Sequence, residues 1–519
     1  MEDNKLILAL GLSALFVLLS KLVSTAMKPR LNLPPGPWTL PLIGSLHHLV
    51  MKSPQIHRSL RALSEKHGPI MQLWMGEVPA VVVSSPAVAE EVLKHQDLRF
   101  ADRHLTATIE EVSFGGRDVT FAPYSERWRH LRKICMQELL TAARVRSFQG
   151  VREREVARLV RELAADAGAG GDAGVNLNER ISKLANDIVM VSSVGGRCSH
   201  RDEFLDALEV AKKQITWLSV ADLFPSSKLA RMVAVAPRRG LAGRKRMEHV
   251  IRQIIQERKE QLMDNGDDTA AGEAAAGKEC FLDVLLRLQK DGGTPIPVTD
   301  EIIVVLLFDM FTGASETSPT VLIWILAELM RCPRVMAKAQ AEVRQAAVGK
   351  TRITENDIVG LSYLKMVIKE ALRLHSPAPL LNPRKCRETT QVMGYDIPKG
   401  TSVFVNMWAI CRDPKYWEDP EEFKPERFEN NCVDFKGNNF EFLPFGSGRR
   451  ICPGINLGLA NLELALASLL YHFDWKLPNG MLPKDLDMQE TPGIVAAKLT
   501  TLNMCPVTQI APSSAEDAS

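Results

Sequence analysis

The sequence predicts a mainly α-helical protein with small β-sheets and a transmembrane helix at the N-terminus. Apolar residues recur with a helical period over residues 151–165, 244–263, 300–330, 333–347 and 363–374. Short β-type runs occur at 71–74, 78–83 and 401–405, which is enough for a minor sheet only. A strongly apolar run lies within the first 30 residues. These observations favour a helical body with one membrane anchor.

The N-terminal run, residues 6–27, is apolar apart from a single lysine. A helix over these residues would rise about 33 Å, which is enough to cross a bilayer. Glu2 and Asp3 precede the run and Lys28 and Arg30 follow it, an asymmetry that leaves the large C-terminal part in the cytosol. We therefore expect residues 1–30 to be an uncleaved anchor. The alternative is a secretory signal cleaved after the small residues at 24–26.

The chain after the anchor divides into a hinge, a body and a tail. Residues 31–45 contain Pro34-Pro35-Gly36-Pro37, a stiff extended segment that cannot continue a helix. Residues 46–510 are expected to form one folded body, followed by a flexible tail at 511–519. Two Gly- and Ala-rich stretches, 164–174 and 264–278, are predicted to be surface loops.

The composition excludes several classes of function. A net charge of +2 gives no global electrostatic case for a nucleic-acid partner. The nine cysteines are odd in number and include no Cys-x-x-Cys pair, so a zinc site of close pairs and a disulfide framework are both unsupported. No Gly-x-Gly-x-x-Gly follows a predicted strand, so the chain has no flavin or nicotinamide site of its own.

Cys452 lies in a glycine-rich loop, Phe445-Gly446-Ser447-Gly448-Arg449-Arg450-Ile451-Cys452-Pro453-Gly454. The glycines at 448 and 454 permit conformations and close approaches that a Cβ would forbid. Loop N–H groups and the positive end of a helix beginning near Asn456 would favour a thiolate at Cys452. The simpler interpretation of the loop alone is a turn with a buried cysteine.

This loop resembles the haem-ligand motif of the cytochrome P-450 family, F-x-x-G-x-R-x-C-x-G, at every fixed position: Phe445, Gly448, Arg450, Cys452 and Gly454. The resemblance implies the cytochrome P-450 fold and a haem b cofactor whose iron is bound by the Cys452 thiolate. It also implies that Arg450 faces a haem propionate. Trp128 and Arg132 resemble the family's W-x-x-x-R motif, whose side chains bind a propionate, and Arg384 resembles a further propionate contact.

A second pair of motifs concerns structure. Glu370 and Arg373 resemble the family's E-x-x-R element, and Arg427 lies in a P-E-R-F sequence further on. The resemblance implies that the three side chains interlock as a buried structural triad behind the haem loop. From the spacing alone, Glu370 and Arg373 would share one helical face, and a surface ion pair of little energetic value remains the alternative.

The long apolar helix predicted at 300–330 carries a third motif. Its residues 313–318 resemble the pattern [A/G]-G-x-[D/E]-T-[T/S] of the helix that crosses the haem face in the family. The resemblance implies catalytic roles for Glu316 and Thr317, which would relay protons to dioxygen. Gly313 matches the first position, whereas Ala314 replaces the usual second glycine.

The resemblance covers nearly the whole chain and implies a monooxygenase of the endoplasmic reticulum that uses O2 and electrons from NADPH–cytochrome P-450 reductase. The chain is similar to the plant members of family 71, and among these we expect the maize zealexin synthases to be nearest. Those enzymes oxidise the sesquiterpene olefin β-macrocarpene to an acid, a defence compound, and related enzymes oxidise diterpene olefins. Two alternatives remain open: a haem-thiolate isomerase or dehydratase that uses no O2, and a non-catalytic membrane-anchored haem protein.

Family analogy also predicts the substrate pocket. Most of its members are apolar, which suits a lipophilic polycyclic terpenoid. The predicted residues are Thr108, Ile109, Phe114, Val305, Asp309, Ala314, Ala378, Leu380, Leu381, Asn382, Ile494 and Val495.

Overall fold

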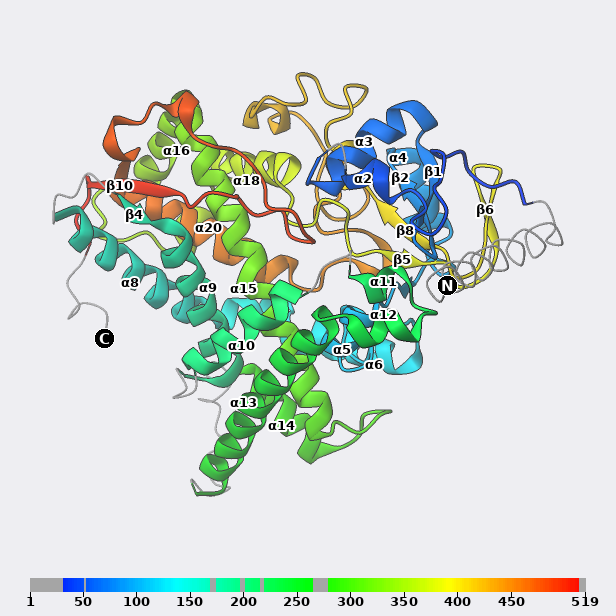
Figure 1. Ribbon diagram of the computed structural model, residues 1–519. Coiled ribbons are helices and arrows are strands. Elements are labelled where there is room, and N and C mark those ends of the chain that lie inside the picture. The colour runs from blue at the N-terminus through cyan, green and yellow to red at the C-terminus, as the bar shows by residue number, and fades with distance from the viewer. Residues whose placement is uncertain are drawn as a thin grey trace, which may run out of the picture.

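The structure is a computed structural model, and it describes residues 31–50, 53–168, 174–196, 201–214, 219–264 and 279–512. The expected membrane anchor at 1–30 and most of the expected tail lie outside the described residues. Within the described part, helices dominate and the strands form small sheets (Figure 1). The predicted mainly α class is therefore confirmed.

The longer helices form most of the body, and each predicted helical stretch corresponds to one of them. Their bounds are α3 Ile56–His67, α8 Gln149–Gly168, α9 Leu177–Val194, α10 Arg201–Gln214, α13 Ala236–Asp264, α14 Phe281–Asp291, α15 Asp300–Arg331, α16 Pro333–Ala346, α18 Ser362–Leu374 and α20 Ile455–His472.

Shorter helical segments connect them. These are α2 Leu46–Val50, α4 Pro86–Glu90, α5 Ala107–Val112, α6 Glu126–Ile134, α7 Ala142–Ser147, α11 Val220–Leu223, α12 Lys228–Val233, α17 Glu355–Ile358 and α19 Met407–Ile410, with single π turns at Glu91–His95 and Cys135–Leu139 and 3₁₀ turns at Pro425–Phe428, Gly448–Arg450, Pro478–Gly480 and Pro483–Asp485.

The central helix α15 passes through the middle of the molecule (Figure 1). Thr299 caps it, because its hydroxyl accepts the Ile302 N–H at 3.4 Å, and Asp300 and Glu301 complement the positive end of the helix. Most of α15 is buried in the core on all sides. It is the one helix of the described residues with the length and apolarity to cross a bilayer, and its burial fits a core helix.

The main sheet has five strands in the order β1-β2-β8-β5-β3, where β1 is Ile70–Met75, β2 Val78–Val83, β8 Ser402–Val405, β5 Arg384–Lys385 and β3 Asp102–Arg103. Strands β1 and β2 pair antiparallel, with Ile70 opposite Val83, and β2 pairs parallel with β8. A three-stranded sheet joins β4 Val175–Asn176, β10 Asn503–Thr508 and β9 Phe473–Lys476, and β6 Thr390–Val392 and β7 Tyr395–Ile397 form a hairpin.

The proline-rich hinge lies against the main sheet. Gln72 donates its N–H to the Pro35 carbonyl at 2.8 Å, and Asn32 donates its backbone N–H to the Asp396 carboxylate at 2.8 Å. A Cβ on Gly36 would lie 2.1 Å from the Gln72 carbonyl oxygen, so only glycine allows this approach. The described part of the hinge is therefore fixed to the folded body.

One loop prediction is wrong in part. Residues 164–168 continue α8 as helix instead of opening a loop at residue 164. Alanine has the highest helix propensity, and this short Ala-rich stretch extends a helix that the preceding residues have already nucleated. The remainder of that stretch and residues 265–278 lie largely or wholly outside the described residues.

Candidate active site

The cysteine loop is held in a conformation that requires glycine at one position. Gly448 has φ +67°, and a Cβ there would lie 2.4 Å from the Leu93 carbonyl oxygen and 2.8 Å from Asp97 Oδ1. Gly454 has ordinary φ, and a Cβ on it would make only van der Waals contact with Cys452 Sγ at 3.8 Å. The structure therefore requires glycine at 448, as expected, whereas it leaves room for a Cβ at 454.

Cys452 lies three residues before α20, as the sequence predicts. Its N–H donates to the Phe445 carbonyl at 2.9 Å, which closes the loop. Burial raises the pKa of the Cys452 thiol, whereas the Gly454 N–H and the positive charge of Arg132 lower it. The Gly454 N–H and Arg132 therefore offset only part of the desolvation cost of a buried thiolate. Coordination to a metal ion would keep this thiol deprotonated.

Four arginines converge beside this loop: Arg103, Arg132, Arg384 and Arg450. Burial and mutual repulsion lower the pKa of Arg450 to about 9 and that of Arg384 to about 10, and they lower the pKa of Arg103 strongly. Arg384 pairs with Asp97 at 3.3 Å. Arg103, Arg132 and Arg450 form no ion pair with any described residue.

A buried cluster of this kind fits an anionic ligand. Removing several guanidinium groups from water is costly unless opposite charge compensates them. Arg450 donates to the carbonyls of Ala101 and Val119, and its guanidinium lies 4.0 Å from the Trp128 ring centre. Arg132 donates to the Ile451 carbonyl, directly before Cys452. The two propionates of a haem would supply the missing negative charge next to a potential thiolate ligand.

Residues 118–122 form a loop that contacts both the arginines and the central helix. Asp309 of α15 accepts the Val119 N–H at 2.8 Å and the Thr120 hydroxyl at 3.0 Å. The Val119 carbonyl accepts the Trp128 indole N–H at 2.9 Å, and Arg103 donates to the Thr120 carbonyl at 3.1 Å. Asp309, expected to face a substrate, therefore uses its carboxylate to hold this loop.

The environment of Asp309 predicts a pH-dependent stability. Burial raises the pKa of Asp309 to about 6. A carboxyl whose pKa is raised by folding favours the folded state while it is protonated, and this advantage is lost as the pH rises through about 6. We expect Asp309→Asn, which keeps acceptor and donor groups at this place, to be more stable than the wild type above that pH by up to about 3 kcal/mol. Thermal denaturation of the holoenzyme at about pH 5 and about pH 7.5 measures the difference. Glu301→Gln, at the exposed start of the same helix, is the control, and an equal pH response in Asp309→Asn and the wild type would contradict the assignment.

Glu370, Arg373 and Arg427 meet in the structure. The Glu370 and Arg373 side chains are both fully buried, with Arg373 Nε 2.8 Å from Glu370 Oε2. Arg427 Nε lies 2.9 Å from Glu370 Oε1, and the Lys424 N–H donates to the same oxygen at 2.9 Å. The carboxylate thus joins α18 to the turn at 424–427, and burial excludes the surface-pair interpretation.

The exposed strip of α15 is short and carries the predicted catalytic pair. Gly313 and Thr317 are exposed and Glu316 is half-buried, in a helix that is otherwise mostly buried. The Thr317 hydroxyl donates to the Gly313 carbonyl at 2.8 Å, and a Cβ on Gly313 would meet open space. A Cβ on Gly458 of α20 would lie 3.7 Å from Ser318 Oγ, so the strip and the helix after Cys452 are neighbours. Ala314 is half-buried against the core, and the open space lies at Gly313.

Several predicted pocket residues come together in two apolar groups. Ile109, Leu380 and Ile494 belong to one cluster with Phe404. Phe114 packs edge-on against Phe308 of α15 at 5.1 Å, near Ala314 in a second cluster. The Ala496 N–H donates to the Pro377 carbonyl at 3.0 Å, which places residues 494–496 beside 377–382.

Thr108 and Asn382, two other predicted pocket residues, form hydrogen bonds within the protein. Thr108 is fully buried, and its N–H and hydroxyl both donate to Asp222. Asn382 accepts Arg103 at its backbone carbonyl, and its neighbour Leu381 has a left-handed φ of +50°. Ala378 and Val495 are half-buried. Sequence reasoning missed Arg103 and Asp222, because neither lies in a recognisable motif.

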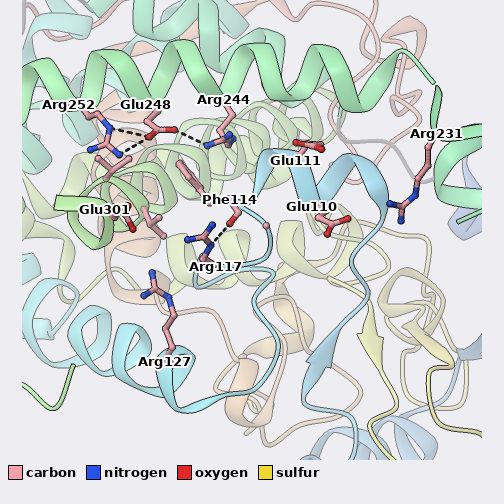
Figure 2. Close-up of a pocket in the computed structure, with 13 residues that line it drawn as sticks. Glu110, Glu111, Phe114, Arg117, Arg127, Arg231, Arg244, Glu248, Arg252 and Glu301 are labelled. Carbon is pink, nitrogen blue, oxygen red and sulfur yellow. Dashed lines mark hydrogen bonds and ion pairs between the residues drawn. The ribbon is translucent and has the colours of Figure 1, made fainter. Parts of the chain in front are cut away.

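A cavity of about 460 Å³ opens between α5, α6, α13 and α15 (Figure 2). Figure 2 shows Glu248 of α13 bridging Arg244 and Arg252, and Arg127 extending toward Arg117. Two of the predicted pocket residues, Phe114 and Val305, line this cavity, but most of the other lining side chains are charged, unlike those of the predicted apolar pocket. Its lining is Glu110, Glu111, Phe114, Gly115, Arg117, Arg127, Arg231, Arg244, Glu248, Arg252, Glu301, Val304 and Val305.

Comparison with known proteins identifies the family of the chain. The family model of cytochrome P-450 matches residues 34–503, and the chain belongs to the cytochrome P-450 family of monooxygenases. The family binds haem through a cysteine thiolate. Its fold is the mostly helical one described above.

Three curated relatives match along their whole length. The chain is 96% identical over 519 residues to the ent-cassadiene hydroxylase of Oryza sativa subsp. japonica, with all of both chains covered. It is 90% identical to the ent-isokaurene C2/C3-hydroxylase of the same plant, covering 99% of this chain and 100% of the relative. Zealexin A1 synthase of Zea mays is 56% identical, with the same coverage. The expectation that the zealexin synthases are nearest is therefore wrong.

Proposed function

We propose that this protein is a haem-thiolate monooxygenase that hydroxylates a polycyclic diterpene olefin. The observation that carries the proposal is the very high identity, over the full length, to two rice enzymes named for hydroxylating ent-cassadiene and ent-isokaurene. The apolar groups around Ile109, Leu380 and Phe114 suit a hydrocarbon. Oxidation of β-macrocarpene to an acid is the second candidate, favoured only by the more distant likeness to zealexin A1 synthase.

The residues that would hold the cofactor are the loop cysteine and the cationic cluster beside it. Cys452 would bind the iron, and Trp128, Arg132, Arg384 and Arg450 would hold the propionates. Phe445, Gly448 and Gly454 shape the loop around the sulfur. Haem ligated in this way supplies dioxygen activation and insertion of one oxygen atom into a C–H bond.

Proton supply would come from the exposed strip of α15. The Thr317 hydroxyl directs its hydrogen to the Gly313 carbonyl, which leaves its lone pairs open to a water molecule in the space beside Gly313. Glu316, half-buried next to it, would pass protons from the solvent side to that hydroxyl. This arrangement favours the monooxygenase over an isomerase or dehydratase, which needs no proton delivery to dioxygen.

Electrons would come from NADPH–cytochrome P-450 reductase. The outer side of α6 exposes Arg129 and Lys133, and Arg449 is half-exposed beside the cysteine loop. Positive charge at this face suits an acidic flavoprotein and makes association dependent on salt.

We also propose that the protein is anchored in the endoplasmic reticulum membrane by residues 1–30, with the body in the cytosol. Exposed apolar side chains gather near the hinge and α11–α12, among them Leu42, Val220, Leu229 and Met232. The two regions adjoin, because Gly76 donates to the Ile43 carbonyl and Glu77 donates to the Leu223 carbonyl. An apolar surface of this extent suits contact with lipid.

The test uses the full-length chain with a plant reductase, NADPH and O2, and identifies products by mass spectrometry. The substrates are ent-cassadiene, ent-isokaurene and β-macrocarpene. We expect a hydroxylated diterpene, with turnover at least about tenfold above that of β-macrocarpene. Isotopic oxygen from ¹⁸O2 should appear in the product. Preferred oxidation of β-macrocarpene would replace the proposed substrate class, and turnover without NADPH would overturn the monooxygenase assignment.

A further inference from the structure

The Phe114 ring is held by two helices through two different kinds of contact. The Arg244 guanidinium of α13 lies 4.7 Å from the ring centre, which is a cation–π interaction. The Phe308 ring of α15 packs edge-on against the same ring at 5.1 Å, with the two ring planes at 90°. Both interactions have preferred geometries, so together they define the direction of the Phe114 ring as well as its place.

The backbone at Phe114 has a conformation that a bulky residue rarely adopts. Its φ is +55°, in the left-handed region, and such a residue persists only where its surroundings over-determine it. The Phe114 carbonyl accepts the Arg117 Nε–H at 3.0 Å, and Gly115 donates its N–H to the Glu110 carbonyl at 2.8 Å. These bonds fix the backbone, and the direction of the ring is left to its side-chain contacts.

Arg244 is in turn held in position by a second pair of contacts. Its Nη1 lies 2.8 Å from Oε2 of Glu248, one turn further along α13, and Glu248 also pairs with Arg252 at 2.8 Å (Figure 2). Arg244 Nε is buried and has no hydrogen-bond partner among the described residues. An unpaired buried donor is costly, and the electron-rich face of the Phe114 ring offsets part of that cost.

Phe114 is close to the part of α15 where the reaction is expected. Phe308, on which its ring packs, precedes Gly313 by five residues, a rise of about 7.5 Å along the helix. Phe114 and Ala314 both pack against the apolar cluster that contains Phe308. A change in the direction of the Phe114 ring therefore alters the wall against which a hydrocarbon would lie near the open space at Gly313.

We propose that Arg244 is a positioning residue that fixes the Phe114 ring and thereby determines which carbon of the substrate is oxidised. This rests on the proposed function, because it takes Phe114 as part of the wall of the substrate pocket. A polycyclic olefin has many C–H bonds and no polar group for orientation, so the shape of the pocket wall selects among them. A ring that is free to turn away from α13 admits more than one orientation of the same hydrocarbon.

The test compares Arg244→Gln with Arg252→Gln, since each removes one of the two arginines paired with Glu248 and Arg244 is the one over the Phe114 ring. Arg244→Lys is the conservative variant, and Arg244→Gln is also made in a Phe114→Leu background. All are full-length holoenzymes whose carbon monoxide difference spectrum shows an intact haem-thiolate centre.

Two properties of these proteins are measured. The first is the ratio of hydroxylated products formed from ent-cassadiene with reductase and NADPH. The second is the ratio of the dissociation constants of 1-phenylimidazole and 4-phenylimidazole, followed by the shift of the haem absorption band. These two isomers direct their phenyl rings differently from the iron, so their relative affinity reports the shape of the pocket without a terpene.

We expect Arg244→Gln to raise the ratio of minor to major products about fivefold, the size expected for loss of one cation–π interaction. The ratio of the two dissociation constants should change by a similar factor. Arg244→Lys should stay within about twofold of the wild type, because it keeps a cation near the ring. Arg252→Gln should match the wild type. In the Phe114→Leu background, Arg244→Gln should have no further effect, because the ring through which it acts is absent.

Unchanged values of both ratios in Arg244→Gln would overturn the proposal, and so would equal shifts with and without the Phe114 ring. Absence of any hydroxylated product from ent-cassadiene in the wild type would instead count against the proposed substrate class. The two phenylimidazoles would then still decide the role of Arg244.

Discussion

Glu370→Ala is expected to unfold the region behind the cysteine loop and to prevent stable haem retention. The substitution leaves Arg373 and Arg427 without their carboxylate, and Arg373 is completely buried. Breaking a buried ion pair on one side typically costs about 3–5 kcal/mol. Arg373 keeps its bonds to the carbonyls of Cys411, Pro420 and Glu422, so its position is retained in part while its charge is not compensated.

The effect should reach the cysteine loop through aromatic packing. The Arg373 guanidinium lies 5.2 Å from the Trp417 ring centre, and Trp417 contacts Phe442, which lies three residues before Phe445. The measurement is the rate at which the thiolate-type carbon monoxide spectrum disappears on heating. Glu429→Ala, an exposed carboxylate directly after the same turn, should change stability by less than about 0.5 kcal/mol. A Glu370→Ala protein as heat-resistant as the control would refute a structural role for the triad.

The second large effect is expected for Cys452→Ser, which should abolish monooxygenase turnover. A serine hydroxyl cannot replace a thiolate as the electron-donating ligand of the iron. The arginines around the propionate site are unaffected, so the variant should still take up haem while losing the thiolate-type carbon monoxide spectrum. Cys432→Ser, at an exposed cysteine, should behave as the wild type. A thiolate-type spectrum in Cys452→Ser would assign the iron to another cysteine.

The sequence motifs predicted those parts of the site that are local in the chain. Each of these parts lies within ten residues of sequence: the cysteine loop, the E-x-x-R pair and the strip at Gly313–Thr317. The relative positions of their side chains therefore follow from the local backbone structure. The bounds of α15 were predicted closely, at 300–330, because a long apolar run defines the helix. Arg427 needed the family resemblance, since it meets Glu370 across 57 residues.

The polar contacts formed across long separations were not predictable. Thr108 and Asp309 were expected to face a substrate, but their partners lie 114 and 190 residues away and are fixed only by the fold. Arg103 was missed for the same reason, because it meets Asn382 across 279 residues. The sequence could not decide between a sesquiterpene and a diterpene olefin as the substrate, since apolar side chains such as Ile109 and Leu380 favour any hydrocarbon of suitable shape.

The loop at 118–122 couples the position of α15 to that of the cysteine loop. Asp309 of α15 and Arg450 of the cysteine loop both bond to this loop, at Val119. A bulky ligand that displaces α15 would therefore also displace residues 118–122, which hold the arginine of the cysteine loop in place. The strength of haem binding and the shape of the bound ligand are therefore coupled through this loop. Substitutions that enlarge the space near Asp309 should increase the loss of haem.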